Sequence, residues 1–154
     1  MKLKNYLFEG FGFPVIFKEL PAIKLRGEII PDIDFSLIAP ALIKFICMQQ
    51  AEPLSGYQVR FFRSALGLTI RDFAKLVGVR HPSVIRWEKH KNHSAQIEAH
   101  IEIVIRILMI KKFDGDKEEI LEVMKHVEGV EKLKTCRYKK FQPVEVPSDL
   151  TFVR

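Results

Sequence analysis

The sequence has few of the features that mark secreted, membrane-spanning or metal-stabilised proteins. It contains only two cysteines, Cys47 and Cys136, and their wide separation matches neither a disulfide framework nor a zinc-ligand spacing. No apolar run is long enough to cross a bilayer. Residues 1–13 lack the continuous apolar core of a signal peptide, because Glu9 and two glycines interrupt them. We therefore expect a soluble cytoplasmic protein that needs no disulfide.

Groupings of residues typical of catalysis or metal binding are also scarce. No serine, cysteine or pair of carboxylates has an activating partner that the sequence makes recognisable. His90 and His93 have the spacing of metal ligands, and His100 follows, but no cysteine or carboxylate cluster joins them. We expect no enzyme activity, no metal site and no cofactor.

The sequence does contain a positive charge that is concentrated in one segment. Residues 54–112 hold 11 lysines and arginines against 4 aspartates and glutamates, whereas residues 1–53 hold 6 of each and residues 113–154 hold 8 against 9. Clustered cations release counterions from a phosphate backbone, so their position matters more than the net charge of +6. This distribution predicts a polyanionic partner for the central segment.

Residues 69–88, TIRDFAKLVGVRHPSVIRWE, have the pattern of two short helices around a tight turn. Ala74 supplies the small side chain needed where two steeply crossing helices approach, and Gly78 suits the left-handed residue that ends the first helix. The apolar side chains expected to face inward are Val79, Val84 and Trp87. The same spacing places on the outward side Arg80, His81, Ser83 and Arg86. An outward helix face that carries arginine suits a groove of DNA.

Capping signals predict where the helices around this motif begin. Ser55 with Gln58 forms a capping box, Thr69 with Asp72 repeats the cap, and Pro82 suits the first position of a helix. These signals predict three successive helices, over residues 56–66, 70–77 and 82–89.

Two further helices are expected after the motif. The first, over residues 95–112, has one apolar stripe of Ile97, Ile101, Val104, Ile105 and Leu108 and a second of Ile103, Ile107 and Ile110. Two stripes predict cover on both sides, either by the N-terminal segment or by a second subunit. The next helix, over residues 117–128, is closed by Gly129 and has an apolar face of Ile120, Leu121, Met124 and Val127. The tail from residue 132 is expected to be extended or irregular.

The N-terminal part has the pattern of a separate β/α module for dimerisation or partner binding. Two or three short strands are expected between Phe13 and Ile30, joined by turns at proline and glycine. An apolar helix over residues 35–48 follows, in which Pro40 is tolerable only near the start. The expected domains are residues 1–52 for this module, 53–112 for the helix-turn-helix, and 113–154 for the C-terminal helix and tail.

The run LSGYQVRFFRSALGLTIRDFAKLVGVRHPSVIRWEKHKN, residues 54–92, resembles the Xre, or lambda-repressor-like, helix-turn-helix family. Its first residues are most similar to the DNA-binding half of MqsA-type antitoxins. The resemblance implies a mainly α fold, a five-helix lambda-repressor-like helix-turn-helix domain with a small N-terminal β-containing module. The zinc-binding cysteine pairs of MqsA-type N-terminal domains are absent, so this module must hold together by packing alone.

The resemblance also implies roles for individual residues. Arg86 lies at the recognition-helix position that commonly binds guanine through two hydrogen bonds, and His81 and Ser83 lie at neighbouring outward positions. Contacts to phosphates, which set register without reading sequence, are expected from Arg71, Lys75, Lys89 and Lys91. Arg80 is expected to contact DNA from the outward side of the motif. Thr69 could add a phosphate contact, although capping is its first role. Structural roles fall to Ala74, Gly78, Val84 and Trp87, and to Arg63 and Glu88, which match a pair that ties the first helix to the recognition helix.

Together these features predict a sequence-specific DNA-binding transcriptional regulator, and the resemblance implies an antitoxin-type repressor of its own operon. A homodimer would bind a palindromic operator in double-stranded DNA, with half-sites about 34 Å or a multiple apart. The protein would also hold a cognate toxin and would not associate with a membrane. The alternative is a protein-protein interaction module that uses a helix-turn-helix fold without specific DNA binding.

Overall fold

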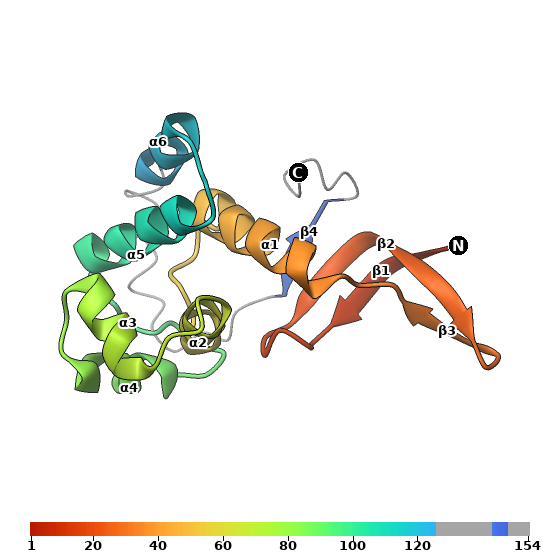
Figure 1. Cartoon of the computed structure of the whole chain (residues 1–154), viewed down its shortest axis with the longest axis horizontal. Helices are drawn as coiled ribbons and strands as arrows, with labels where there is room; N and C mark the ends of the chain where they lie inside the picture. Colours follow the sequence, from red (N-terminus) through yellow and green to blue (C-terminus); the bar gives the residue numbers. More distant parts are fainter. Residues whose placement is uncertain (126–142, 148–154) are drawn as a thin grey trace. The chain divides into compact units, whose positions relative to one another are not determined.

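The computed structural model describes residues 1–125 and 143–147, which form six helices and four strands in two compact units (Figure 1). We call residues 1–42 with 142–154 the sheet unit and residues 43–141 the helical unit. The boundary between residues 42 and 43 lies within a helix, and the sheet unit contains residues from both ends of the sequence. The boundaries between these units, after residues 42 and 141, differ from the domain boundaries expected from the sequence, after residues 52 and 112.

The sheet unit is built around one long strand, β2 (Val15–Leu25), which pairs with the other three strands. β1 (Lys2–Phe8) and β3 (Glu28–Pro31) run antiparallel to β2 and pair with its residues 15–21 and 22–25, respectively. β4 (Val144–Val146) runs parallel to residues 15–17. The result is a mixed sheet in which residues far apart in the sequence become neighbours.

Pro21 lies inside β2 and does not break the strand. It lies between the residues that pair with β4 and the residues that pair with β3. The carbonyl of Pro21 accepts a hydrogen bond from the Asp32 N–H at 2.8 Å, and the N–H of Ala22 donates to the Met1 carbonyl at 3.0 Å. Because the strand continues through the proline, the region expected to hold two or three short strands contains one strand of 11 residues and, after a turn at Gly27, the short strand β3.

A cluster of phenylalanines forms the apolar core beside the sheet. The ring centroids of Phe8 and Phe11 are 5.1 Å apart, and Phe35 lies 5.8 Å from Phe8 and 5.6 Å from Phe11. Phe11, Phe13 and Phe17 are buried. Aromatic pairs at these separations add a favourable ring-ring term to the burial of apolar area. Such packing gives the sheet unit a core of its own.

Helix α1 (Phe35–Gln49) follows the sheet and belongs partly to each unit. Its start is fixed by Asp34, whose side chain accepts hydrogen bonds from the Ser36 N–H at 3.0 Å and from the Ser36 hydroxyl at 2.6 Å. Pro40 is the sixth residue of the helix, deeper than the position near the start at which we expected it to be tolerable. It lacks an N–H, so the carbonyl one turn earlier loses its usual intrahelical donor.

The helical unit contains the predicted helix-turn-helix. Its helices α2, α3 and α4 span Gly56–Ala65, Ile70–Val77 and His81–Glu88, within one residue of the predicted bounds. The capping box forms, because the Ser55 hydroxyl accepts from the Gln58 N–H at 3.2 Å and the Gln58 side chain accepts from the Ser55 N–H at 3.1 Å. The Thr69 hydroxyl likewise accepts from the Asp72 N–H at 3.1 Å. These local predictions are confirmed.

Helix α5 (Ala99–Lys112) begins four residues later than predicted. Residues 94–98 instead form an extended connection in which Ser94 makes an isolated β-bridge with Ser55, and the Ala95 N–H donates to the Leu54 carbonyl at 2.9 Å. Gln96 adopts a left-handed conformation with φ of 58°, which is incompatible with a helix. Pairing with a distant segment therefore replaces the first turn of the predicted helix.

The buried face of α5 is not the pair of apolar stripes that we expected. Residues buried on this helix are Ala99, Glu102, Ile105, Arg106, Met109 and Ile110. Val104, assigned to the first stripe, is 42% exposed. Two charged residues thus occupy the inner face, because they pair with each other and with backbone groups.

Helix α6 (Lys117–Lys125) also differs from its predicted orientation. Leu121 and Met124, assigned to the apolar face, are 56% and 54% exposed, whereas Val123 is buried. An ion pair of 3.0 Å between Lys44 and Glu119 connects α1 to α6. The predicted end of this helix, with Val127 and Gly129, lies outside the described residues, as do Cys136 and most of the C-terminal tail.

The prediction of a mainly α, five-helix fold is therefore wrong. The described residues form six helices and a four-stranded mixed sheet, which is an α/β fold. The error arose because residues 2–8 and 144–146 form strands only by pairing with β2. Neither segment has a local pattern strong enough to predict its strand.

Candidate nucleic-acid interface

The α3–turn–α4 segment is held together by a small apolar core. Ala74, Val84 and Trp87 are buried, and Val79 is half-buried. Gly78 ends α3 in a left-handed conformation with φ of 84°, and its N–H donates to the Ala74 carbonyl at 2.9 Å. A residue without Cβ adopts this conformation at little cost. The inward positions predicted for the motif are confirmed, except that Val79 is only partly covered.

A hollow of about 920 Å³ lies between α3 and α4. The residues that line it are Arg71, Ala74, Lys75, Val79, Arg80, His81, Pro82, Ser83 and Arg86. Six of the nine are side chains that the sequence assigns to DNA contact, and no carboxylate is among them. The fold therefore brings together, on one surface of the helical unit, the four lysines and arginines that the sequence distributes over residues 71–86.

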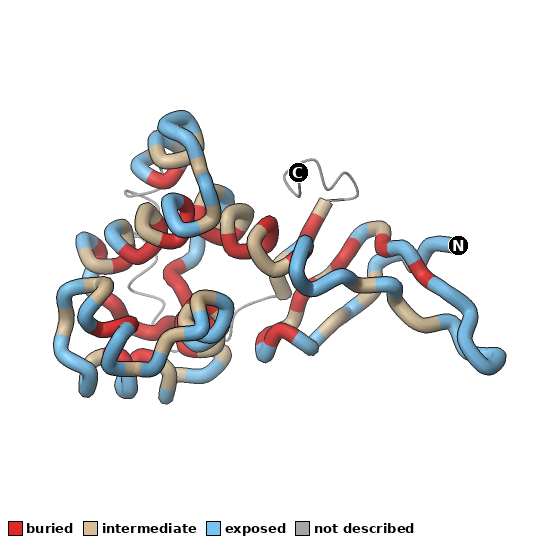
Figure 2. The backbone as a smooth tube through the Cα atoms, viewed as in Figure 1, coloured by how far each residue is buried: buried red, intermediate tan, exposed pale blue. Residues whose placement is uncertain are grey.

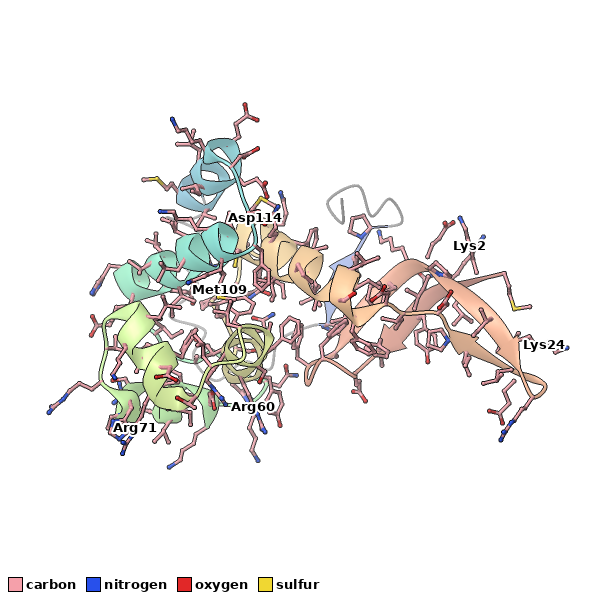
Figure 3. All side chains as sticks on the ribbon, viewed as in Figure 1. Lys2, Lys24, Arg60, Arg71, Met109 and Asp114 are labelled. Carbon is pink, nitrogen blue, oxygen red and sulfur yellow. The ribbon has the colours of Figure 1, made fainter. Side chains whose placement is uncertain are left out.

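The side chains around this hollow are accessible to a large partner. Arg71, Lys75, Arg80, His81 and Arg86 are exposed, and Ser83 is half-buried. Figure 2 shows the exposed residues of α3 and α4 in pale blue along the surface of the helical unit. Arg71, labelled in Figure 3, extends from α3 away from the packed helices. The resulting surface has the charge and exposure that binding to a polyanion requires.

The carboxylate at the end of α4 is held by an arginine from α2. The Arg63 guanidinium donates to both oxygens of Glu88, at 2.7 and 3.2 Å, and to the carbonyl of Leu68 at 3.1 Å. This predicted pair forms, and its bidentate geometry fixes the end of α4 against α2 and the connection between α2 and α3. The pairing also balances the charge of Glu88, the acidic residue nearest to Arg86 in the sequence.

Contacts that the sequence did not predict fix the start of α2 against the segment that follows α4. The Tyr57 N–H donates to the Lys91 carbonyl at 2.8 Å, and the Gly56 N–H donates to the His93 carbonyl at 3.2 Å. A Cβ at Gly56 would lie 2.5 Å from the Trp87 carbonyl oxygen and 2.7 Å from the Lys91 nitrogen. Only glycine allows the start of α2 to approach the end of α4 this closely. A glycine directly after an N-cap serine is the signal that could have indicated such an approach.

A buried ion pair, also missed from the sequence, connects α5 to the end of α1. Arg106 donates to the Gln50 and Glu52 carbonyls at 2.8 and 2.9 Å, and Glu102 accepts from the Leu54 N–H at 2.7 Å. Arg106 and Glu102 lie 3.3 Å apart and are both buried. Their spacing of four residues was the available signal, but it is equally typical of a solvated helix face. The pair fixes the segment that leads into α2.

Three of the predicted contact residues lie outside the lining of the hollow. Lys89, Lys91 and Thr69 are exposed, and Lys91 has a left-handed conformation with φ of 53°.

Among the residues that the structure describes, no three histidine, cysteine, aspartate or glutamate side chains lie together as a metal site would require. The roles predicted for the individual residues in DNA contact stay predictions.

No family model, curated protein or solved structure matches the chain. Within the described ranges, no helix combines the length and the apolar character needed to span a bilayer.

Proposed function

We propose that this protein is a sequence-specific DNA-binding transcriptional regulator. The observation that carries the proposal is the meeting of six predicted DNA-contact residues around the hollow between α3 and α4. Beneath this cationic surface, Val84 and Trp87 are buried, so α4 has one side fixed in the protein and one side open. This is the arrangement by which a helix-turn-helix places a helix in the major groove.

In the proposed mechanism, α4 enters the major groove and the surrounding cations contact the phosphates. Arg86 would bind a guanine through its O6 and N7 atoms, a contact that contributes about 1–3 kcal/mol of discrimination between bases. Arg71, Lys75 and Arg80 would set the register on the backbone. The pairs that fix α4 would hold Arg86 in a constant orientation, since base recognition requires a well-positioned guanidinium.

The direct test is selection of binding sites from random duplex DNA by the purified full chain. A regulator enriches one sequence, and its affinity for that sequence falls steeply as the salt concentration rises. Enrichment of no sequence would reject the proposal. An enriched sequence with two-fold symmetry would further support a homodimer that binds a palindromic operator.

Two neighbouring substitutions on α4 test the assignment of its faces. Arg86→Ala should relax base preference and leave the melting temperature nearly unchanged, because its side chain is exposed. Trp87→Ala should cost about 3–5 kcal/mol of stability, because it leaves a cavity in the core. Equal loss of stability in both variants would contradict the assignment.

The biological context that we propose is an antitoxin-type repressor of its own operon, acting in the cytoplasm. This part of the proposal rests on the sequence resemblance to Xre-type and MqsA-type proteins. It predicts a small toxin gene beside the gene for this chain and co-purification of the two products. A neighbouring gene product that does not bind the chain would exclude this context and leave DNA binding intact.

The second candidate function is a protein-protein interaction module, and one observation favours it. The sheet unit exposes several large apolar side chains: Leu7, Ile23, Leu25, Ile29, Phe35 and Leu37. Apolar side chains gathered on one unit are typical of surfaces that bind another protein. Binding of a partner without any selection of DNA would favour this function over the first.

A further inference from the structure

We propose that Ile85 recognises a thymine by packing against its C5 methyl group in the major groove, an inference that rests on the proposed function. Within residues 54–92, all of which the structure describes, Ile85 is the one large apolar residue that is exposed, at 38%. The other large apolar residues of this segment are buried or half-buried. Its exposure is therefore an exception in the segment that carries the cationic surface.

The position of Ile85 on α4 places it at the edge of the open face. Its neighbour Val84 is buried, whereas its other neighbour Arg86 is exposed and lines the hollow. Pro82, three residues earlier, is also exposed and lies on the same side of the helix. Pro82 and Ile85 thus form an apolar strip beside the guanidinium of Arg86. A helix that enters the groove through Arg86 brings this strip to the base edges as well.

The chemistry of the groove identifies the group that fits this strip. Bases present hydrogen-bond donors and acceptors in the major groove, and the C5 methyl of thymine is the apolar group among them. The charge of the nearby side chains favours DNA as the occupant, because the hollow that Pro82 and Arg86 line is also lined by arginine, lysine and histidine and by no carboxylate. The combination of Arg86 and Ile85 predicts a half-site in which a guanine lies close to a thymine.

The expected effect is moderate and measurable. Burial of one methylene-sized group contributes about 0.8 kcal/mol, which corresponds to roughly fourfold in affinity. Removal of one recognised thymine methyl should therefore weaken binding by roughly three- to tenfold. A direct hydrogen bond to the thymine O4 atom would not respond to this change.

The experiment compares thymine with uracil in the duplex obtained by site selection. Uracil lacks only the C5 methyl, so each thymine of a half-site is replaced in turn by uracil and the affinity of the full wild-type chain is measured. At least one replacement should weaken binding by roughly three- to tenfold. Ile85→Ala should bind the thymine and uracil duplexes equally, at the affinity that the wild type has for the uracil duplex. Val104→Ala, at a residue of α5 with 42% exposure, is the matched control and should discriminate as the wild type does.

The outcomes separate this inference from the proposed function. If a site is selected and Arg86→Ala relaxes it, but no uracil replacement weakens wild-type binding, the thymine contact is refuted and DNA binding stands. The contact is also refuted if Ile85→Ala retains the full preference for thymine, or if the selected half-site contains no thymine. Failure to select any site rejects the proposed function and the inference with it.

Discussion

Cys47 illustrates how burial determines the chemistry of a single side chain. It lies in α1 and has no exposed surface, and burial raises the pKa of its thiol to about 12. The thiolate is the reactive form, so the folded protein should not expose Cys47 to alkylation at neutral pH.

The measurement uses a Cys136→Ser variant, in which Cys47 is the remaining cysteine. Iodoacetamide should modify this variant at the rate of global unfolding in native buffer, and within minutes in denaturant. Rapid modification of the native variant would contradict the burial of Cys47.

Gly56 determines how closely α2 can approach α4. The Cβ of an alanine would meet backbone atoms of Trp87, Glu88 and Lys91 at 2.5 to 2.9 Å. Backbone atoms cannot rotate away as a side chain does, so we expect Gly56→Ala to destabilise the protein by about 1–3 kcal/mol.

Chemical denaturation monitored by Trp87 fluorescence would measure this loss. Ser64→Ala, at an exposed position of the same helix, is the control and should change stability by less than about 0.5 kcal/mol. If Gly56→Ala left the free energy of unfolding unchanged, α2 and α4 would be able to move apart without loss of stability.

The buried pair on α5 connects three elements of the helical unit. Arg106 donates to four carbonyls, of Ile46, Cys47, Gln50 and Glu52, and Glu102 accepts from the backbone ahead of α2. Loss of one partner leaves a charge in a site shielded from water, so Arg106→Met should cost about 3–5 kcal/mol.

A double-mutant cycle tests this coupling. Glu102→Gln removes the charge but retains an oxygen that can accept from the Leu54 N–H. The variant with both substitutions should therefore be more stable than the sum of the two single effects predicts, by at least about 1 kcal/mol. Additive effects would show that the two charges do not interact.

The elements that the sequence predicted are those with local signals. Ser55 with Gln58, Thr69 with Asp72, and Gly78 each form hydrogen bonds or a backbone conformation within a few residues, so α2, α3 and α4 could be placed from the sequence. The cationic side of α4 followed from the same helical spacing, because Val84 and Trp87 define the opposite side.

The elements that the sequence did not predict depend on distant partners. β1 and β4 exist through pairing with β2, and residues 95–98 leave the helical conformation because Ser94 pairs with Ser55. The burial of Glu102 depends on the Leu54 N–H, 48 residues away, and that of Arg106 on carbonyls as far as 60 residues away. Helical periodicity cannot distinguish such a buried charged pair from a solvated one.

The number of subunits on DNA can be measured through salt dependence of binding. Each phosphate contact contributes about −0.9 to the slope of log K against log salt concentration. Five predicted phosphate contacts per subunit, from Arg71, Lys75, Arg80, Lys89 and Lys91, therefore predict a slope of about −4.5 for one subunit and about −9 for a dimer.

Single variants calibrate this slope. Lys75→Ala should make it less steep by about 1 per bound subunit. Lys112→Ala, at the end of α5 and outside the hollow, should leave it unchanged. A slope that does not respond to Lys75→Ala would place the phosphates away from the hollow.

The parallel pairing of β4 with β2 has a consequence for biosynthesis. The helical unit is one continuous stretch, residues 43–141, so the ribosome releases all of it before residues 144–146 emerge. The nascent chain can form the helix-turn-helix before β4 is available to pair with residues 15–17 of β2. The sheet that contains β1 and β2 is thus completed only after the whole helical unit has been released.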